Sequence, residues 1–250
     1  MSVARVSPIL VALVLLGCGS HAHKQTVPVR SGTAASATRH TPAAPAVVRV
    51  PAGSGPLAVM ATAHGLTLRA EPGGKVIAHL RPHTAWGSPT VVWAPERRGQ
   101  WLGVVATSLP NNRIGWLNVR HDRPRMWRSR YSLEADLSTR TLVLRRGGRI
   151  ARRMSVAIGT PSTPTPTGRF TITDKLIPDR SLSYYGCCVL ALSGHQPYLR
   201  PGWAGGDRIA IHGGGSVGTA ASAGCLHLAD ADLRHLMRIL PLGTPVVIHA

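Results

Sequence analysis

Cys225 and His212 form the pair of residues best suited to chemistry in this chain. Cys225 follows Ser222, Ala223 and Gly224, and His212 ends an apolar run thirteen residues upstream. A free thiol is mostly protonated at neutral pH, but a neighbouring imidazole can take its proton and give a thiolate–imidazolium pair. The two residue types together predict nucleophilic attack on a carbonyl carbon.

The backbone around Cys225 is expected to support the same chemistry. A tight glycine turn exposes the sulfur and aligns the N–H groups of Ala223, Gly224 and Cys225, which predicts an oxyanion hole. A general base also needs a group that fixes its tautomer. Since no Asp or Asn is placed for that role, we expect a backbone carbonyl near Gly213 to orient His212.

The N-terminus predicts export. Arg5 precedes an apolar run from Ile9 to Leu16, which is too short to span a bilayer and is typical of a secretory signal. The following Gly17 and Cys18 resemble the end of a bacterial lipobox, in which the cysteine becomes the lipidated first residue. We expect a cell-envelope protein held at the outer face of the cytoplasmic membrane by lipidated Cys18. A secreted or periplasmic protein with an ordinary signal peptide is the alternative.

Residues 19–56 and 57–122 differ in character. The first stretch is rich in Ala, Thr, Ser and Pro without apolar periodicity, which predicts a disordered linker. The second has short apolar segments separated by Gly and Pro, which predicts a small β barrel. The expected strands are 57–62, 66–69, 76–79, 91–94, 101–106 and 115–119. This region resembles bacterial SH3-like domains in Leu66-x-Leu68-Arg69-Ala70-x-Pro72-Gly73-Gly74 and in Gly115-Trp116-Leu117.

Residues 127–250 predict a second domain that is mainly β with one helix. The expected strands are 131–136, 141–146, 149–157, 168–172, 209–211 and 244–249. A helix is expected over 230–240, where Leu233, Leu236, Met237 and Leu240 recur at helical spacing. We expect Asp230 to cap this helix and Pro241 to stop it.

Three cysteines remain if Cys18 is lipidated, so at least one thiol stays free. Adjacent cysteines form a disulfide only with a strained peptide, so Cys187 and Cys188 are interpreted as buried small hydrophobic residues. Their segment is expected to cover the cleft. Its candidates for substrate contact are Tyr184, Tyr185 and His195.

The second domain resembles the catalytic domain of YkuD-like L,D-transpeptidases. The similarity covers roughly residues 130–249 and is carried by His212 to Leu228, by the 159–170 loop and by the ending at 242–248. It implies a β-sandwich in which Cys225 is the nucleophile and His212 the general base, with no cofactor and no metal. Ser222 and Gly224 would shape the turn.

The resemblance also implies a reaction. Cys225 would attack the meso-diaminopimelate carbonyl of a peptidoglycan tetrapeptide stem and release D-Ala. An amine of a second stem would then take the acyl group and form a 3→3 cross-link. Water as acceptor would instead make the protein an L,D-carboxypeptidase. Carbapenems are expected to acylate Cys225.

Two positions depart from the family pattern. Many members carry His where this chain has Ala223, and Arg or Asn where it has His227. The resemblance implies that His227 helps to hold the substrate, together with Gly213. A packed strand residue is the alternative for His227.

Two other classes of protein stay open. A non-catalytic wall-binding lipoprotein with a degenerate domain would fit the departures, although Cys225 and His212 are both retained. A zinc peptidase could use His212, Cys225 and His227, but the usual ligand spacings are missing.

The charge is strongly unbalanced, with 29 Lys and Arg against 10 Asp and Glu and a net charge of +19. Such a balance first suggests nucleic acid, which the export signal disfavours. The stretch from residue 123 to 153 contains ten Arg but only two acidic residues, Glu134 and Asp136. Residues 154–250, which hold Cys225 and His212, carry nearly equal numbers of basic and acidic residues. We therefore expect the charge to govern where the protein sits, with an arginine coding bias as the alternative. The Gly- and Pro-rich composition excludes a coiled coil, and no apolar run is long enough for a polytopic membrane protein.

Overall fold

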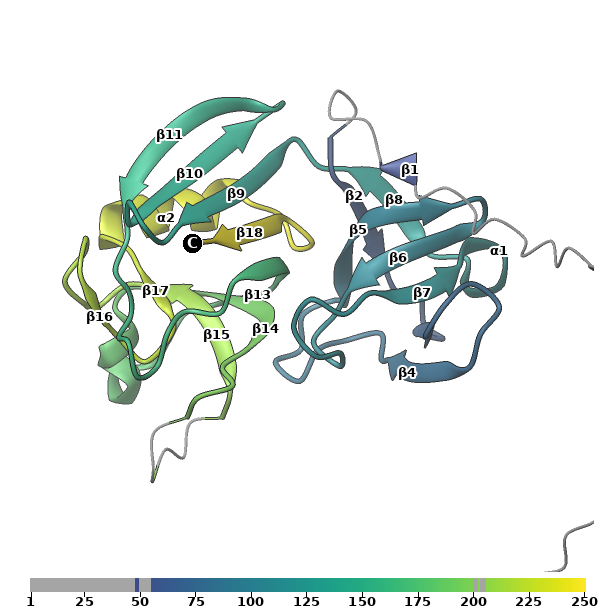
Figure 1. The fold of residues 1–250 in the computed structure, drawn as a ribbon, viewed down its shortest axis with the longest axis horizontal. Helices are drawn as coiled ribbons and strands as arrows, with labels where there is room; N and C mark the ends of the chain where they lie inside the picture. Colours follow the sequence, from purple (N-terminus) through teal and green to yellow (C-terminus); the bar gives the residue numbers. More distant parts are fainter. Residues whose placement is uncertain (1–47, 50–54, 200–201, 203–205) are drawn as a thin grey trace, which may run out of the picture. The chain divides into compact units, whose positions relative to one another are not determined.

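The computed structural model describes residues 48–49, 55–199, 202 and 206–250 (Figure 1). The predicted signal, Cys18 and most of the predicted linker lie outside these residues. None of the helices formed by the described residues is both long and apolar enough to cross a membrane.

The first half of the described chain forms one antiparallel sheet (Figure 1). Its path runs β4-β3-β7-β6-β5-β2-β8, with β1 paired to β5. Its elements are β1 (Val48–Arg49), β2 (Leu57–Met60), β3 (Leu66–Arg69), β4 (Val76–Leu80), β5 (Val91–Arg98), β6 (Trp101–Val105), β7 (Gly115–Asn118), the short helix α1 (Val119–Asp122) and β8 (Arg125–Arg128). The pairing path ends at β4 and β8, so the SH3-like barrel stays a prediction.

Alternation of apolar and polar residues explains why these segments are strands. In β3, Leu66 and Leu68 are buried while Thr67 and Arg69 are partly exposed, because successive side chains point to opposite faces. Strand β8 is absent from the predicted strands. It pairs with β2, so the first sheet extends to Arg128, beyond the boundary predicted at residue 122.

The second half forms a mixed sheet in the order β11-β10-β9-β18-β13-β14-β15-β17. Its strands are β9 (Tyr131–Asp136), β10 (Thr141–Arg146), β11 (Arg149–Ser155), β13 (Gly168–Leu176), β14 (Val189–His195), β15 (Arg208–His212), β17 (Leu226–His227) and β18 (Pro245–His249). A separate parallel pair joins β12 (Ile158–Gly159) to β16 (Ala220–Ser222). The chain also forms the 3₁₀ helix η2 (Arg180–Tyr185) and the helix α2 (Asp230–Ile239).

Strand β13 lies between β18 and β14 and joins the strands on either side of it into one sheet. Its first residues pair with β18, whereas Ile172 and the residues after Thr173 pair with β14. Helix α2 adds Leu233 and Leu236 to the apolar core that these strands share. The domain is therefore mainly β, as the sequence predicts, and one strand connects its two groups of strands.

The start of α2 differs from the prediction. Ala229, not Asp230, occupies the N-cap position, and its side chain makes no capping bond. Asp230 instead receives a hydrogen bond from the Cys187 N–H at 3.4 Å and lies 3.3 Å from Arg234. This carboxylate is thus used to hold the segment before β14.

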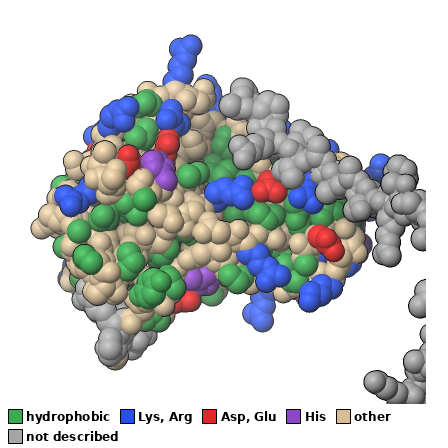
Figure 2. Space-filling view, in the orientation of Figure 1, with side chains coloured by type: hydrophobic (Ala, Val, Ile, Leu, Met, Phe, Trp, Pro, Cys, Tyr) green, Lys and Arg blue, Asp and Glu red, His purple; other side chains and the backbone are tan. Residues whose placement is uncertain are grey.

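The arginine-rich segment lies on β8 to β11. Figure 2 shows several separate groups of Lys and Arg side chains on the visible face, one of them at the upper left, where Figure 1 places β10 and β11. In the edge strand β11, Arg149, Arg152 and Arg153 are all exposed. Arg152 pairs with Asp232 of α2, but the strand still presents a basic edge to solvent.

Phe170 provides a test of the second core. Its side chain is 1% exposed, and a Cβ added at Gly194 would lie 2.6 Å from its ring. Phe170→Ala should lower the free energy of unfolding by about 3–5 kcal/mol, because it leaves a cavity in a closely packed interior. Denaturant titration measures this loss. Ile177→Ala, at a side chain 75% exposed, is the control and should change stability by less than about 0.5 kcal/mol.

Candidate active site

The pairing of two strands brings Cys225 and His212 together. β15 and β17 run parallel, with Ile211 opposite Leu226 and His212 opposite His227. The same register places Cys225 beside Ala210, whose backbone hydrogen-bonds the thiol. Because residues two apart on a strand point to the same face, Cys225 and His212 share one face of this strand pair.

The tautomer of His212 is fixed by its neighbour. The ring is 1% exposed, and Nδ1 lies 2.7 Å from the Gly213 carbonyl oxygen. A carbonyl only accepts, so Nδ1 carries the hydrogen and Nε2 keeps a free lone pair. The predicted backbone carbonyl at Gly213 is therefore confirmed.

Ser222 holds the turn before Cys225 closed. Its hydroxyl donates to the Cys225 carbonyl at 2.6 Å and accepts from the Gly224 N–H at 3.0 Å. Gly224 has a φ of +116°, a conformation that side chains disfavour. The Gly224 N–H is thus already used, so an oxyanion hole made of all three predicted amides is wrong in this conformation. The amides of Ala223 and Cys225 remain the candidates.

Two tyrosines and a second histidine surround His212. The His227 ring centroid lies 4.2 Å from that of His212, and the Tyr185 centroid lies 5.0 Å from it. Tyr184 lies 5.6 Å from His212 and 6.1 Å from His227. His227 is 6% exposed, and its Nε2 has no hydrogen-bond partner among the described residues. Three predicted site residues therefore pack around the base.

Burial makes the neutral forms of both reactive groups the stable ones. Burial, with repulsion from His227, lowers the pKa of His212 to about 4, against the opposing effect of the Gly213 bond. Burial likewise raises the pKa of Cys225 to about 11. The resting pair at neutral pH is a thiol and an imidazole, not the expected thiolate and imidazolium. The pKa of Tyr185 is raised by burial and then by the nearby Cys225.

A pocket of about 580 Å³ opens onto this pair. Cys225, His212, Ala223, Tyr184 and Tyr185 all line it. Its rim carries large apolar side chains that are exposed to solvent: Trp86, Ile177, Leu182, Tyr198 and Leu199. Polar lining comes from Gln196, Asp207 and Arg208. The pocket can therefore take an extended ligand with both apolar and charged groups.

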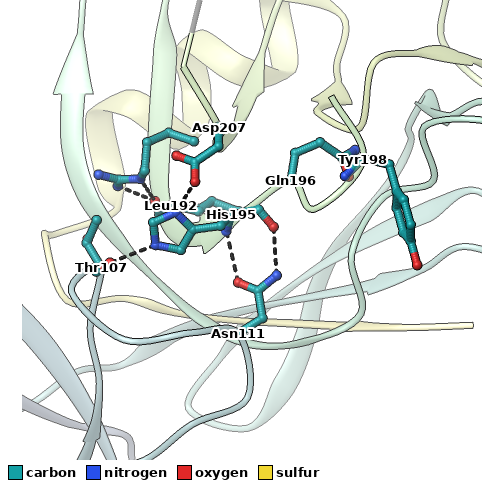
Figure 3. A network of polar contacts seen from close by, with 8 residues as sticks. Thr107, Asn111, Leu192, His195, Gln196, Tyr198 and Asp207 are labelled. Carbon is teal, nitrogen blue, oxygen red and sulfur yellow. Dashed lines mark hydrogen bonds and ion pairs between the residues drawn. The ribbon is translucent and has the colours of Figure 1, made fainter. Parts of the chain in front are cut away.

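His195 lies elsewhere than predicted. It does not line the pocket. Its Nε2 lies 2.6 Å from the Thr107 carbonyl oxygen and its Nδ1 lies 2.9 Å from the Asp207 carboxylate (Figure 3). Both ring nitrogens are thus occupied within the protein, which leaves neither for a substrate.

The adjacent cysteines are joined to each other in a disulfide, contrary to the expectation of two packed thiols. Cys188 is buried, and Cys187 is held against Asp230. Cys225 is the free cysteine among the described residues, in agreement with the expected free thiol.

Gln196 and Asp230 are site residues that the sequence analysis missed. The Gln196 amide reaches the carbonyl of Ala223, and Asp230 supports the backbone before β14. Nothing in the spacing of either residue points to Cys225, because the contacts join segments far apart in sequence.

A zinc peptidase would need three converging ligands, and the described part of the chain brings no such group together.

A free thiol beside a buried neutral imidazole, at the base of a pocket, defines a cysteine site suited to acyl transfer. Residues 130–248 match the family model of the YkuD L,D-transpeptidase catalytic domain.

Two curated relatives agree with that model. The chain is 30% identical over 122 residues to the Bacillus subtilis L,D-transpeptidase YkuD, covering 48% of this chain and 66% of that protein. The Bacillus licheniformis YkuD is 32% identical over 121 residues, covering 47% of this chain and 65% of that protein. The chain thus matches slightly less than two thirds of each relative.

Among solved structures, L,D-transpeptidase 3 from Mycobacterium tuberculosis matches with 16% identity and a TM-score of 0.41, covering 79% of this chain and 92% of that one. The sequence matches, rather than this structure, support an L,D-transpeptidase catalytic domain in the second half of the chain.

The raised pKa of Cys225 predicts slow, strongly pH-dependent alkylation. The rate with iodoacetamide should rise about tenfold per pH unit from 7 to 10, because only the thiolate reacts. Intact-mass kinetics measure it, and Cys225→Ala gives the background from other cysteines. A plateau below pH 8 would contradict the neutral resting pair.

The lowered pKa of His212 predicts a loss of stability in mild acid. The unfolded imidazole binds a proton below pH 6.5, whereas the folded one does so only near pH 4. As pH falls through this window the unfolded state gains protons, so the free energy of unfolding should drop by about 3 kcal/mol. Denaturant titrations at pH 7 and pH 4 test this. His212→Gln should make the free energy of unfolding less dependent on pH between 7 and 4. The same dependence in this variant and in the wild type would contradict a lowered pKa at His212.

Proposed function

We propose that this protein is a peptidoglycan L,D-transpeptidase that forms 3→3 cross-links through a thioester on Cys225. The observation that carries the proposal is the register of β15 and β17, which puts Cys225 and His212 on one face of the strand pair, where both line one pocket. Both residues lie within the segment that matches the family model. The groups around Cys225 and His212 are assigned the remaining steps of the proposed reaction.

His212 acts as the general base. Its Nε2 lone pair takes the thiol proton as the Cys225 sulfur attacks the meso-diaminopimelate carbonyl of a tetrapeptide stem. The imidazolium then returns this proton to the amine of the departing D-Ala. Because the folded pKa of His212 is about 4, the imidazolium is a strong acid and gives the proton up readily.

The negative charge on the tetrahedral intermediate is held by the backbone N–H groups of Ala223 and Cys225. The amine of a second stem then attacks the thioester carbonyl, which forms the cross-link and restores the thiol. His212 removes the proton that this amine loses. If water attacks instead, the product is a tripeptide, which is the L,D-carboxypeptidase alternative.

His227 holds the substrate in place of the Arg or Asn that many family members carry there. Its Nε2, which has no hydrogen-bond partner within the described part of the chain, supports this assignment, because a buried polar atom without a hydrogen bond is costly unless a ligand fills the role. The remaining substrate contacts come from residues next to His212. They are Tyr184 and Tyr185, whose rings pack against the His212 ring, and Gly213, which follows His212 in the chain.

The protein works in the cell envelope during cell-wall biogenesis, without a cofactor. Lipidated Cys18 anchors it to the membrane, and the linker and SH3-like domain hold the catalytic domain towards the wall. The anionic lipids and wall polymers of that compartment match the net charge of +19. The predicted export signal is the reason that we expect no nucleic-acid partner.

A carbapenem adduct tests the nucleophile. The wild-type protein should gain the mass of one carbapenem, and Cys225→Ala should abolish the adduct. His212→Ala should slow adduct formation at least about 100-fold, because general-base catalysis contributes roughly this much. Intact mass spectrometry over time measures both effects. The paired substitution of Cys187 and Cys188 by Ser is the control and should keep the adduct.

Stem peptides test the reaction itself. Disaccharide-tetrapeptides should yield cross-linked dimers with loss of D-Ala, separated by liquid chromatography and mass spectrometry. Tripeptide alone would assign the carboxypeptidase reaction instead. A wild-type protein that gives neither product nor adduct would overturn the catalytic proposal in favour of a non-catalytic wall-binding lipoprotein.

A further inference from the structure

Gln196 links the turn before Cys225 to a second loop. The side chain is buried, and Nε2 donates to the Ala223 carbonyl at 2.9 Å and to the Pro164 carbonyl at 3.0 Å. The Thr163 carbonyl lies 3.4 Å from the same nitrogen, and Oε1 accepts from the Tyr198 N–H at 3.1 Å. Since every neighbour of Nε2 is an acceptor, only an amide in this orientation fits the site.

The turn has no spare room on the side where Gln196 lies. A Cβ added at Gly224 would overlap Gln196 Nε2, so the amide packs directly on the residue before Cys225. Ser222 fixes the other side of the turn through its bonds to Gly224 and to the Cys225 carbonyl. Together Gln196 and Ser222 set where the Ala223 and Cys225 amides point.

Gln196 is held through its backbone and through the residue before it. Its N–H donates to the Asp207 carbonyl at 2.6 Å, and the backbone N–H and carbonyl of the preceding His195 both bond to the Asn111 side chain. Asn111 Nδ2 donates to the His195 carbonyl at 2.6 Å, and Asn111 Oδ1 accepts from the His195 N–H at 2.9 Å (Figure 3). Asn111 lies in the loop between β6 and β7.

The His195 ring strengthens the same connection. Its two nitrogens face the Thr107 carbonyl and the Asp207 carboxylate, both of which only accept, so a hydrogen on either nitrogen finds an acceptor within the protein. Thr107 belongs to the same loop as Asn111. Figure 3 shows the ring between these two acceptors, with the Asn111 amide facing the backbone of His195.

We propose that Gln196 is a positioning residue for the Cys225 turn, and that Asn111, in the loop between β6 and β7, holds Gln196 in place through His195. This loop of the first sheet then helps to position the Cys225 turn and is not only part of a spacer. This inference rests on the proposed acyl transfer, since the geometry it protects is that of the attacking sulfur and the oxyanion amides.

Gln196→Glu tests the amide at constant size. It replaces the donor with an oxygen that faces three carbonyls, so the turn should shift. The rate constant for acylation of Cys225 by a carbapenem should fall about 100-fold, the usual cost of an ångström-scale misplacement. Alkylation by iodoacetamide needs only a reachable thiolate and should stay close to the wild-type rate. Gln100→Glu, in the turn between β5 and β6, is the matched control and should change neither rate.

Asn111→Leu tests the connection to the first sheet. With disaccharide-tetrapeptides it should lower kcat and leave KM nearly unchanged, because it disturbs the turn and not the pocket rim. Asn111→Asp keeps the acceptor for the His195 N–H and should restore part of kcat. The double variant with Gln196→Glu should be no slower than Gln196→Glu alone, because both residues act through one set of contacts.

Equal acylation rates in wild type and Gln196→Glu would overturn the inference while leaving the proposed function intact. Equal losses in acylation and alkylation, with a lowered Tm, would also overturn it, because they indicate a structural role. A wild-type protein that neither a carbapenem nor stem peptides acylate would remove the proposed function, and the positioning role with it.

Discussion

The parallel pairing of β15 with β17 is the interaction on which the site depends. Two residues of β17 pair with β15, and they set Cys225 and His212 on one face of the sheet. A slip of one residue would turn the thiol to the opposite face. The Ser222 hydroxyl and the glycine turn prevent such a slip, since they fix the chain immediately before β17. The two-residue strand β17 can thus position Cys225 because the Ser222 hydroxyl fixes the chain where this strand begins.

The burial that orders this pair also determines its chemistry. Burial disfavours the charged forms of the imidazole and the thiol, so at neutral pH the proton stays on sulfur. An imidazole that is protonated so reluctantly is a weak base but a strong acid once charged. The site is accordingly better suited to the proposed protonation of a leaving amine than to holding a standing thiolate.

Charge and catalysis occupy different parts of the chain. The arginines cluster on β8 to β11, with exposed side chains along the edge strand β11, whereas the pocket is mostly apolar with a few polar groups. The basic edge and the pocket therefore lie on different elements of the second domain. The arginines of β8 to β11 do not line the pocket that holds His212, although Arg208 of β15 does.

The sequence by itself determined the residue types of the site and most of the strands, because alternation, glycine turns and the Cys225 motif are local signals. It also gave the helix over 230–239 and the carbonyl that orients His212. It missed β14, since a strand buried on both faces does not alternate. Only the tertiary structure decided that Cys225 and His212 are neutral at rest, that His195 does not line the pocket, and that Gln196 reaches the turn. Burial and contacts between distant segments set those properties, and no spacing along the chain encodes them.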